Sequence, residues 1–206
     1  MILDREMIER LVDALKVSAL PSPEPKVVLM PDFYLDHLLI YREPLDAFQG
    51  DVMRIGKLGG GIIPGSKQSQ HIRQGGNSVN MAWVLSNLGV NCFLILRTSS
   101  LGLKLLEYFV GSRVDLSHVK ADGKLALTVA LELEYGGTKF NVMMNDPGSI
   151  ADFGFDSLTD DDLSVIRSAE FVCVLNWSSN LKGTELAGKV LELVRKRGKG
   201  KTFFDC

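Results

Sequence analysis

The sequence predicts a three-layer α/β domain, with a mainly parallel sheet between two helical layers and a small β lid. Apolar segments of strand length alternate with amphipathic segments of helical length. Most of the strand segments are apolar throughout, as in parallel sheets that are covered on both faces. One pair of segments within residues 126–144 instead alternates apolar and polar residues, which is typical of a sheet with one open face.

Composition excludes several classes of partner. The 206 residues carry a formal net charge of −2, so we expect binding neither to nucleic acid nor to an anionic membrane.

Cys92 and Cys173 lie in apolar runs, which indicates reduced thiols and a cytoplasmic location. The acidic N-terminus lacks a long apolar run, so we expect no signal peptide and no membrane span. His37, His71 and His118 lack metal-ligand spacing, and we expect no metal site.

Residues 1–25 are predicted to precede the main domain, which spans residues 26–206. Apolar residues recur at helical spacing in segment 3–15, and this indicates an amphipathic helix. The members of this apolar face are Leu3, Met7, Ile8, Leu11, Val12 and Leu15. Three prolines in segment 21–25 then form a stiff linker. We interpret the helix as a packing appendage; a partner-binding helix is the alternative.

The elements of the main domain follow in order. A first strand is expected at 26–30, and the turn-rich segment 44–74 is expected to hold short lid strands. A lid hairpin is expected within 126–144, turning at Gly136-Gly137. The remaining strands are predicted at 92–96, 171–175 and 202–204, and the helices at 79–88, 101–110, 159–168 and 183–195.

The strongest candidate for a ligand site is the run that begins at Gly75 and Gly76. Two glycines let the backbone approach a ligand, and the helix that follows offers free N–H groups and the positive end of its dipole. This helix is apolar nearly all round, so we expect it to be buried. Asn80 would then need a polar partner, since an unpaired buried amide costs about 1–3 kcal/mol. The alternative is a tight turn with Asn77 or Ser78 as a helix cap.

Two further polar residues are expected on the same rim of the sheet. Asp36 follows the first strand and Asn176 follows the strand at 171–175; ligands of open α/β sheets bind beyond the carboxyl ends of the strands. The carboxylate of Asp36 can accept two hydroxyl hydrogen bonds, which suits a polyol. Each residue has a structural alternative: Asp36 could cap the turn after its strand, and Asn176 could cap a loop beside Trp177.

The whole pattern resembles the ribokinase-like (PfkB) carbohydrate kinase family. The resemblance is carried by the run 75–89, by residues 27–37, in which Asp36 stands at the family's sugar-binding position, and by residues 114–119. It implies a sugar or nucleoside kinase that uses ATP or ADP with Mg²⁺. The implied substrate-binding residues are Asp36, Gly75, Gly76, Asn77, Asn80 and Asn176. Lid strands within 44–74 and 126–144 would cover the sugar and could also join two copies into a homodimer.

The chain departs from the family in three ways. Thr98-Ser99-Ser100 replaces an acidic G-D-D motif, and Tyr34 stands where ribokinase has a sugar-contacting Asn. The family also continues into a G-A-G-D segment that carries the catalytic base, with the nucleotide pocket, and this would lie beyond Cys206. The resemblance therefore covers about the first two-thirds of a typical member. We expect the chain alone to be inactive as a kinase, and the alternative function is a non-catalytic sugar-binding or interaction module.

Overall fold

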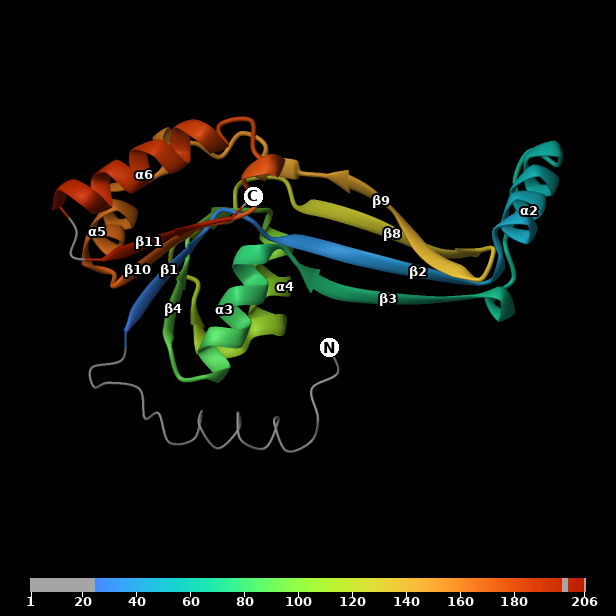
Figure 1. The fold of residues 1–206 in the computed structure, drawn as a ribbon, viewed down its shortest axis with the longest axis horizontal. Helices are drawn as coiled ribbons and strands as arrows, with labels where there is room; N and C mark the ends of the chain where they lie inside the picture. Colours follow the sequence, from blue (N-terminus) through green and yellow to red (C-terminus); the bar gives the residue numbers. More distant parts are fainter. Residues whose placement is uncertain (1–24, 198–199, 206) are drawn as a thin grey trace.

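A computed structural model describes residues 25–197 and 200–205. It contains a central parallel sheet between two layers of helices and a long lid sheet that projects to one side (Figure 1). The three-layer α/β architecture with a β lid is thus confirmed. The helix expected at 3–15 and most of the linker lie outside the described residues.

The central sheet has five parallel strands in the order β11-β10-β1-β4-β6. Its strands are β1 (Lys26–Met30), β4 (Asn91–Leu94), β6 (Val114–Asp115), β10 (Phe171–Val174) and β11 (Lys201–Phe204). Strand β1 is central and pairs with β10 and β4 in parallel register. The first strand was predicted with these bounds. Its apolar run is too short for a helix, and a proline-rich segment and a polar loop mark its two ends.

Helices cover both faces of this sheet. In Figure 1, α3 (Asn77–Asn87) and α4 (Ser100–Val110) lie on one side, and α5 (Asp160–Ser168) and α6 (Gly183–Arg197) on the other. Alternate residues of β1 supply the two cores: Val27 and Leu29 pack toward α3 and α4, and Val28 and Met30 toward α5 and α6. Burial on both faces explains why β1 is apolar at every position from 27 to 30.

The lid sheet has four strands in the order β3-β2-β8-β9. They are β2 (Tyr34–Pro44), β3 (Gln68–Gly75), β8 (Ala126–Tyr135) and β9 (Thr138–Asp146). Strands β2 and β8 are parallel, and the two outer pairs are antiparallel. The predicted hairpin between β8 and β9 is confirmed, and Gly136 and Gly137 supply the positive φ angles of its turn.

The prediction for segment 44–74 was partly wrong. One lid strand, β3, lies there, but β2 precedes the segment, and most of the remainder is helix α2 (Leu45–Lys57) at the far end of the lid (Figure 1). Contacts with the sheet hold this helix: Tyr41 of β2 packs against Phe48 and donates a hydrogen bond to Asp51 at 2.8 Å. Lys67 also reaches Asp51, at 3.0 Å. These contacts are tertiary. The sequence pattern did not indicate the helix, because glycines within it and just after it lower its helix propensity.

Helix α3 is half-buried, whereas nearly complete burial was expected. Val79 and Ala82 are buried, but Trp83, Val84 and Leu88 are 41%, 50% and 49% exposed. The sheet lies on only one side of α3, so it buries only that side.

Smaller elements complete the fold. Strands β5 (Leu96–Arg97) and β7 (Val119–Lys120) form a short parallel pair. Turns of 3-10 helix occur at Gly65–Lys67, Gly111–Arg113, Gly148–Ile150, Phe155–Ser157 and Trp177–Ser179. Among the described residues, no helix combines the length and apolarity that crossing a membrane requires.

Candidate functional site

The candidate site lies where the central sheet meets the lid. Strands β1 and β10 end here, β2 and β8 begin, and β3 leads into α3 (Figure 1). Five of the six predicted binding residues, all but Asn80, stand at these element ends or one or two residues from them. The parallel sheet brings its carboxyl ends to one rim, and the lid strands then rise from that rim.

Asp32 organises this junction. Its side chain is fully buried, two residues after β1. One carboxylate oxygen accepts a hydrogen bond from the backbone N–H of Asn77 at 2.7 Å. The other oxygen accepts from the backbone N–H of Ser78 at 2.9 Å and also from the Ser78 hydroxyl. Asp32 therefore caps α3 from a distant part of the chain, where the local N-cap, Gly76, has no side chain to offer.

This cap corrects the prediction of free N–H groups at the start of α3. The N–H groups of Asn77 and Ser78 bind Asp32, which takes the place expected for an anionic ligand. Sequence reasoning missed this role of Asp32. A carboxylate just after a buried strand was the available signal, but its partner lies 45 residues away in the sequence.

The two glycines make room for two carboxylates. A Cβ on Gly75 would lie 2.2 Å from an oxygen of Asp36, and a Cβ on Gly76 would lie 2.9 Å from an oxygen of Asp32. Gly76 also has a φ of 93°, which disfavours any other residue. The pair was predicted to permit a close approach by a ligand; in the structure it permits a close approach by Asp36 and Asp32.

Asp36 lies on the lid just above the rim. In β2 it stands opposite Arg73 of β3 and Thr128 of β8. Burial raises the pKa of the Asp36 carboxyl, and the Thr128 hydroxyl opposes this rise. A half-buried carboxylate with few partners of its own retains the capacity to accept hydrogen bonds from a ligand.

Tyr34 adds an unpartnered hydroxyl to the same place. Its side chain is 4% exposed, and its Oη makes no hydrogen bond within the described part of the chain. Burial raises the pKa of this phenol. An unpaired buried hydroxyl costs about 1–3 kcal/mol, which a ligand hydroxyl could recover. Tyr34 pairs with Gly75 and is two residues from Asp36, on the same face of β2.

Asn176 and Asn77 both join this network. Asn176 has a left-handed φ of 53°, donates from Nδ2 to Asp32 at 3.0 Å, and accepts from the Ser179 hydroxyl at 3.1 Å. Asn77 donates from its side chain to Asp205 at 3.0 Å. Both residues thus tie separate segments together at the rim.

Asn80 differs from the expectation, because its side chain is exposed rather than buried. It lies one turn into α3, on the solvent side of the helix. Water satisfies such an amide, so the argument from an unpaired buried group does not hold. Its candidacy as a binding residue then depends on the family resemblance alone.

The Thr98-Ser99-Ser100 segment has a structural role in helix α4. The Ser99 hydroxyl accepts from the backbone N–H of Gly102 at 3.1 Å and is the N-cap of that helix. Thr98 is buried, and a Cβ on Gly102 would lie 2.1 Å from its Oγ1. The replacement of acidic residues by hydroxyls is therefore compatible with a helix cap.

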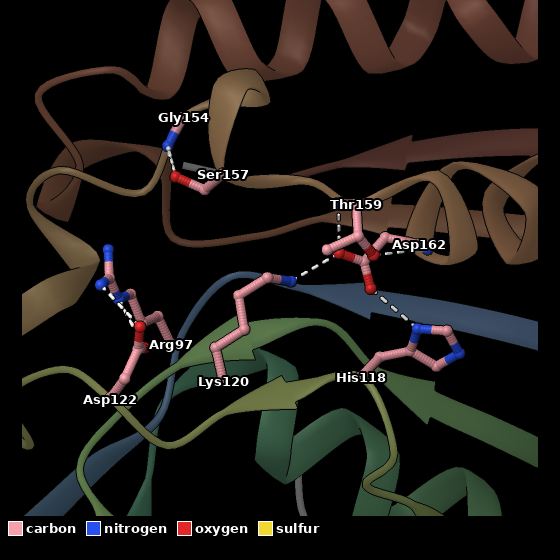
Figure 2. Close-up of polar contacts among 8 residues, drawn as sticks. All are labelled: Arg97, His118, Lys120, Asp122, Gly154, Ser157, Thr159 and Asp162. Atoms are coloured by element: carbon pink, nitrogen blue, oxygen red, sulfur yellow. Dashed lines mark hydrogen bonds and ion pairs between the residues drawn. The ribbon is translucent and has the colours of Figure 1, made fainter.

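A second polar cluster surrounds Asp162 (Figure 2). Asp162 is 1% exposed and contacts Nδ1 of His118 at 2.8 Å, together with the Lys120 ammonium and the Thr159 N–H. Burial alone would raise the pKa of Asp162, but the hydrogen bonds from Lys120, Thr159 and His118 outweigh it and lower that pKa. Figure 2 shows these residues joining the start of α5 to the segment around β7.

This cluster was not predicted, although Asp162 and Thr159 were correctly placed at a helix start. Asp162 and Thr159 form a capping box on α5. The described residues contain no group of three or more His, Cys, Asp or Glu side chains that could hold a metal ion.

Two surface hollows lie away from the site among the described residues. One surrounds Tyr41, Leu133 and Phe140 in the outer half of the lid. The other lies between His118 and α5. The candidate site is defined here by its carboxylates and its unpartnered hydroxyl.

No family model matches the sequence, and no curated protein matches it significantly. Solved structures do match. The ribokinase of Arabidopsis thaliana, complexed with ribose and ATP, has a TM-score of 0.65 at 17% identity, over 89% of this chain and 54% of that chain. A PfkB family carbohydrate kinase from Listeria grayi has a TM-score of 0.63 at 19% identity, over 88% of this chain and 51% of that chain. The ribokinase of Giardia lamblia has a TM-score of 0.62 at 16% identity, over 87% and 50% of the two chains.

These identities are low, so the likeness concerns the fold. This chain spans about half the length of the three solved structures, which is less than the two-thirds expected from the sequence motifs. The resemblance predicted from the sequence is confirmed at the level of the fold: the chain has a ribokinase-like fold, the fold of the PfkB carbohydrate kinases.

Proposed function

We propose that this chain forms the substrate-binding and lid portion of a carbohydrate kinase, which transfers a phosphoryl group from a nucleotide to a hydroxyl of a sugar or nucleoside. The observation that carries the proposal is the position of Asp36. Its half-buried carboxylate stands against Gly75 at the junction of sheet and lid, two residues from the unpartnered hydroxyl of Tyr34. A carboxylate and a hydroxyl side by side suit the vicinal hydroxyls of a sugar.

The other predicted binding residues divide into two roles. We propose that Gly75, Gly76, Asn77 and Asn176 hold the site in shape, since each contacts Asp32, Asp36 or Asp205. Asp36 is proposed to contact substrate hydroxyls directly. Asn80, which is exposed, is proposed as a second contact on the family resemblance alone.

The nucleotide and Mg²⁺ of the proposed reaction do not fit the described residues. Asp32 occupies the N–H groups at the start of α3, where a phosphate would otherwise bind. The described part of the chain also lacks a carboxylate cluster for Mg²⁺. We therefore assign no residue of this chain to the catalytic base, the nucleotide or the metal, and residues 1–206 alone are expected to release no ADP from ATP in the presence of sugar.

A non-catalytic sugar-binding or interaction module is the alternative function. Its one specific support in the sequence was the loss of acidic residues at Thr98-Ser99-Ser100. Because Ser99 caps α4, that change has a structural explanation. No other observation in the described residues favours this alternative.

We also propose a homodimer through the lid. On the face of the lid opposite Asp36, the apolar residues Leu127, Val142 and Met144 are 43%, 43% and 56% exposed. They lie on the neighbouring strands β8 and β9. An apolar sheet face of this kind marks an interaction surface.

Ligand titration followed by NMR tests the proposed site. Ribose, fructose and adenosine are added in turn to the chain, and at least one should shift the amide signals of Asp36, Gly75 and Asn80. Asp36→Asn should weaken that binding by about tenfold or more, because one hydrogen bond to a charged group is lost. Asp46→Asn, an exposed change on α2, is the matched control and should bind as the unchanged chain does.

Two results would contradict the proposal. Either none of the three ligands perturbs the rim, or Asp36→Asn binds as tightly as Asp46→Asn.

A further inference from the structure

Helix α3 presents an apolar surface on the side turned away from the central sheet. Trp83, Val84 and Leu88 lie within one side of the helix and are 41%, 50% and 49% exposed. We call these three residues the α3 stripe. No described residue buries them, and a tryptophan, a valine and a leucine together are unusual on a solvent face.

The N-terminal segment enters the described structure beside the α3 stripe. Lys26, the first residue of β1, pairs with Asn91 of β4. Leu88, at the C-terminal end of the stripe, is three residues before Asn91. Helix α3 therefore ends close to the point from which residues 1–25 leave β1, as Figure 1 shows for α3, β1 and β4.

The sequence of segment 3–15 has an apolar face of matching size. Its six apolar residues fall on one side of a helix, and its acidic and basic residues, apart from Asp4 in the first turn, fall on the other. A helix of this length spans about 20 Å, close to the length of α3. Residues 16–25 can extend over about 30 Å, which is enough to return the segment along α3.

We propose that residues 3–15 form an amphipathic helix that packs its apolar face on the α3 stripe, as an additional outer helix of this layer. The tether favours this occupant over a second copy. A short linker holds the segment at an effective concentration in the millimolar range, far above that of another molecule of the same chain. The proposal does not depend on the proposed kinase function, since none of the three stripe residues is a proposed binding residue.

Fluorescence of Trp83 provides the first test. The chain has two tryptophans, and Trp177→Phe leaves Trp83 as the only one. In that background, Leu11→Lys places a charge at the centre of the apolar face, whereas Asp13→Lys changes the opposite face and is the matched control. Leu11→Lys should shift the Trp83 emission to longer wavelength and increase acrylamide quenching, and Asp13→Lys should change neither.

The second test starts from the other side of the contact. Val84→Lys should speed cleavage after Glu6 and Glu9, by a protease specific for glutamate, by about tenfold, because burying an aliphatic side chain shifts an equilibrium by at least that factor. Tyr108→Lys, at an 81% exposed position on α4, is the control and should leave the rate unchanged. Both substitutions are at exposed positions, so the chain should remain folded.

Three outcomes would overturn the proposal. Trp83 is quenched equally in the parent and in Leu11→Lys; or Val84→Lys leaves the cleavage rate unchanged; or protection of Trp83 rises with protein concentration, which would assign the stripe to a second copy.

Discussion

The carboxylate of Asp32 accepts a hydrogen bond from Nδ2 of Asn176 at 3.0 Å, across 144 residues of sequence. The same carboxylate receives the first N–H groups of α3. One buried side chain thus joins the ends of β1 and β10 to the start of α3 at the rim. The shape of the candidate site depends on this connection.

Removal of the Asp32 carboxylate should destabilise the protein. Asp32→Ala leaves the N–H groups of Asn77 and Ser78 without an acceptor, and each unpaired donor costs about 1–3 kcal/mol. We expect a loss of about 3 kcal/mol or more in the free energy of unfolding, measured by urea denaturation. Asp32→Asn, which keeps an acceptor oxygen, should lose less.

Asp122→Asn is the control for the Asp32 variants. The Asp122 side chain is 68% exposed and pairs with Arg97, and an exposed ion pair contributes about 0–1 kcal/mol. Equal stability of Asp32→Ala and Asp122→Asn would show that the Asp32 contacts do not support the fold.

Asp36 should reduce stability at neutral pH. Burial raises the pKa of its carboxyl above the usual 3.8, so the folded state holds the proton more tightly than the unfolded state does. Its contribution therefore becomes less favourable as pH rises above 3.8. Asp36→Asn should be more stable than the unchanged chain at pH 7, and this advantage should shrink toward pH 4 in urea denaturation.

Thr128→Val provides the opposite change at the same place. It removes the hydroxyl that favours ionised Asp36, so it should lower stability at pH 7 more than at pH 4. An Asp36→Asn chain that is less stable than the parent at pH 7 would contradict this account and assign Asp36 a structural role.

The helix at the end of the lid should detach in acid. Hydrogen bonds from Lys67, Tyr41 and Arg54 lower the pKa of Asp51 from 3.8 to about 2. A lowered pKa means that the stabilisation is fully present above pH 3.8 and is lost as pH falls through 2. Hydrogen exchange of the α2 amides, followed by NMR, should therefore show α2 opening over this range.

Asp51→Asn should remove this pH dependence and leave α2 less protected already at neutral pH. Asp46→Asn changes an exposed carboxylate on the same helix, and this variant should keep the pH dependence of α2 exchange. Identical exchange profiles for the two variants would mean that Asp51 does not anchor the helix.

The lid face should control oligomeric state. Val142 and Met143 are adjacent on β9, opposite Leu131 and Ala130 of β8, and point to opposite faces of the lid. Val142→Lys places a charge on the proposed dimer face and should favour the monomer in sedimentation velocity. Met143→Lys, on the face that carries Asp36, should leave the association unchanged. A chain that is monomeric without either substitution would contradict the proposed dimer.

The sequence by itself determined the layers of the central domain. The alternation of apolar strands with amphipathic helices predicted the parallel sheet and most of its elements, and the bounds of β1 were predicted as observed. The Gly136-Gly137 turn was also predicted, because positive φ angles are a local requirement. Such features depend on neighbouring residues and therefore leave a readable pattern.

Only the tertiary structure decided the organisation of the site. The role of Asp32 and the exposure of Asn80 depend on residues that are distant in sequence. Helix α2 depends on tertiary contacts with Tyr41 and Lys67 in the segments that flank it. In the sequence, Asp32 is one of several carboxylates in loops. Only the packed structure places the start of α3 against it. Local pattern fixes which segments form helices and strands, but a hydrogen bond across 144 residues exists only after those segments have packed.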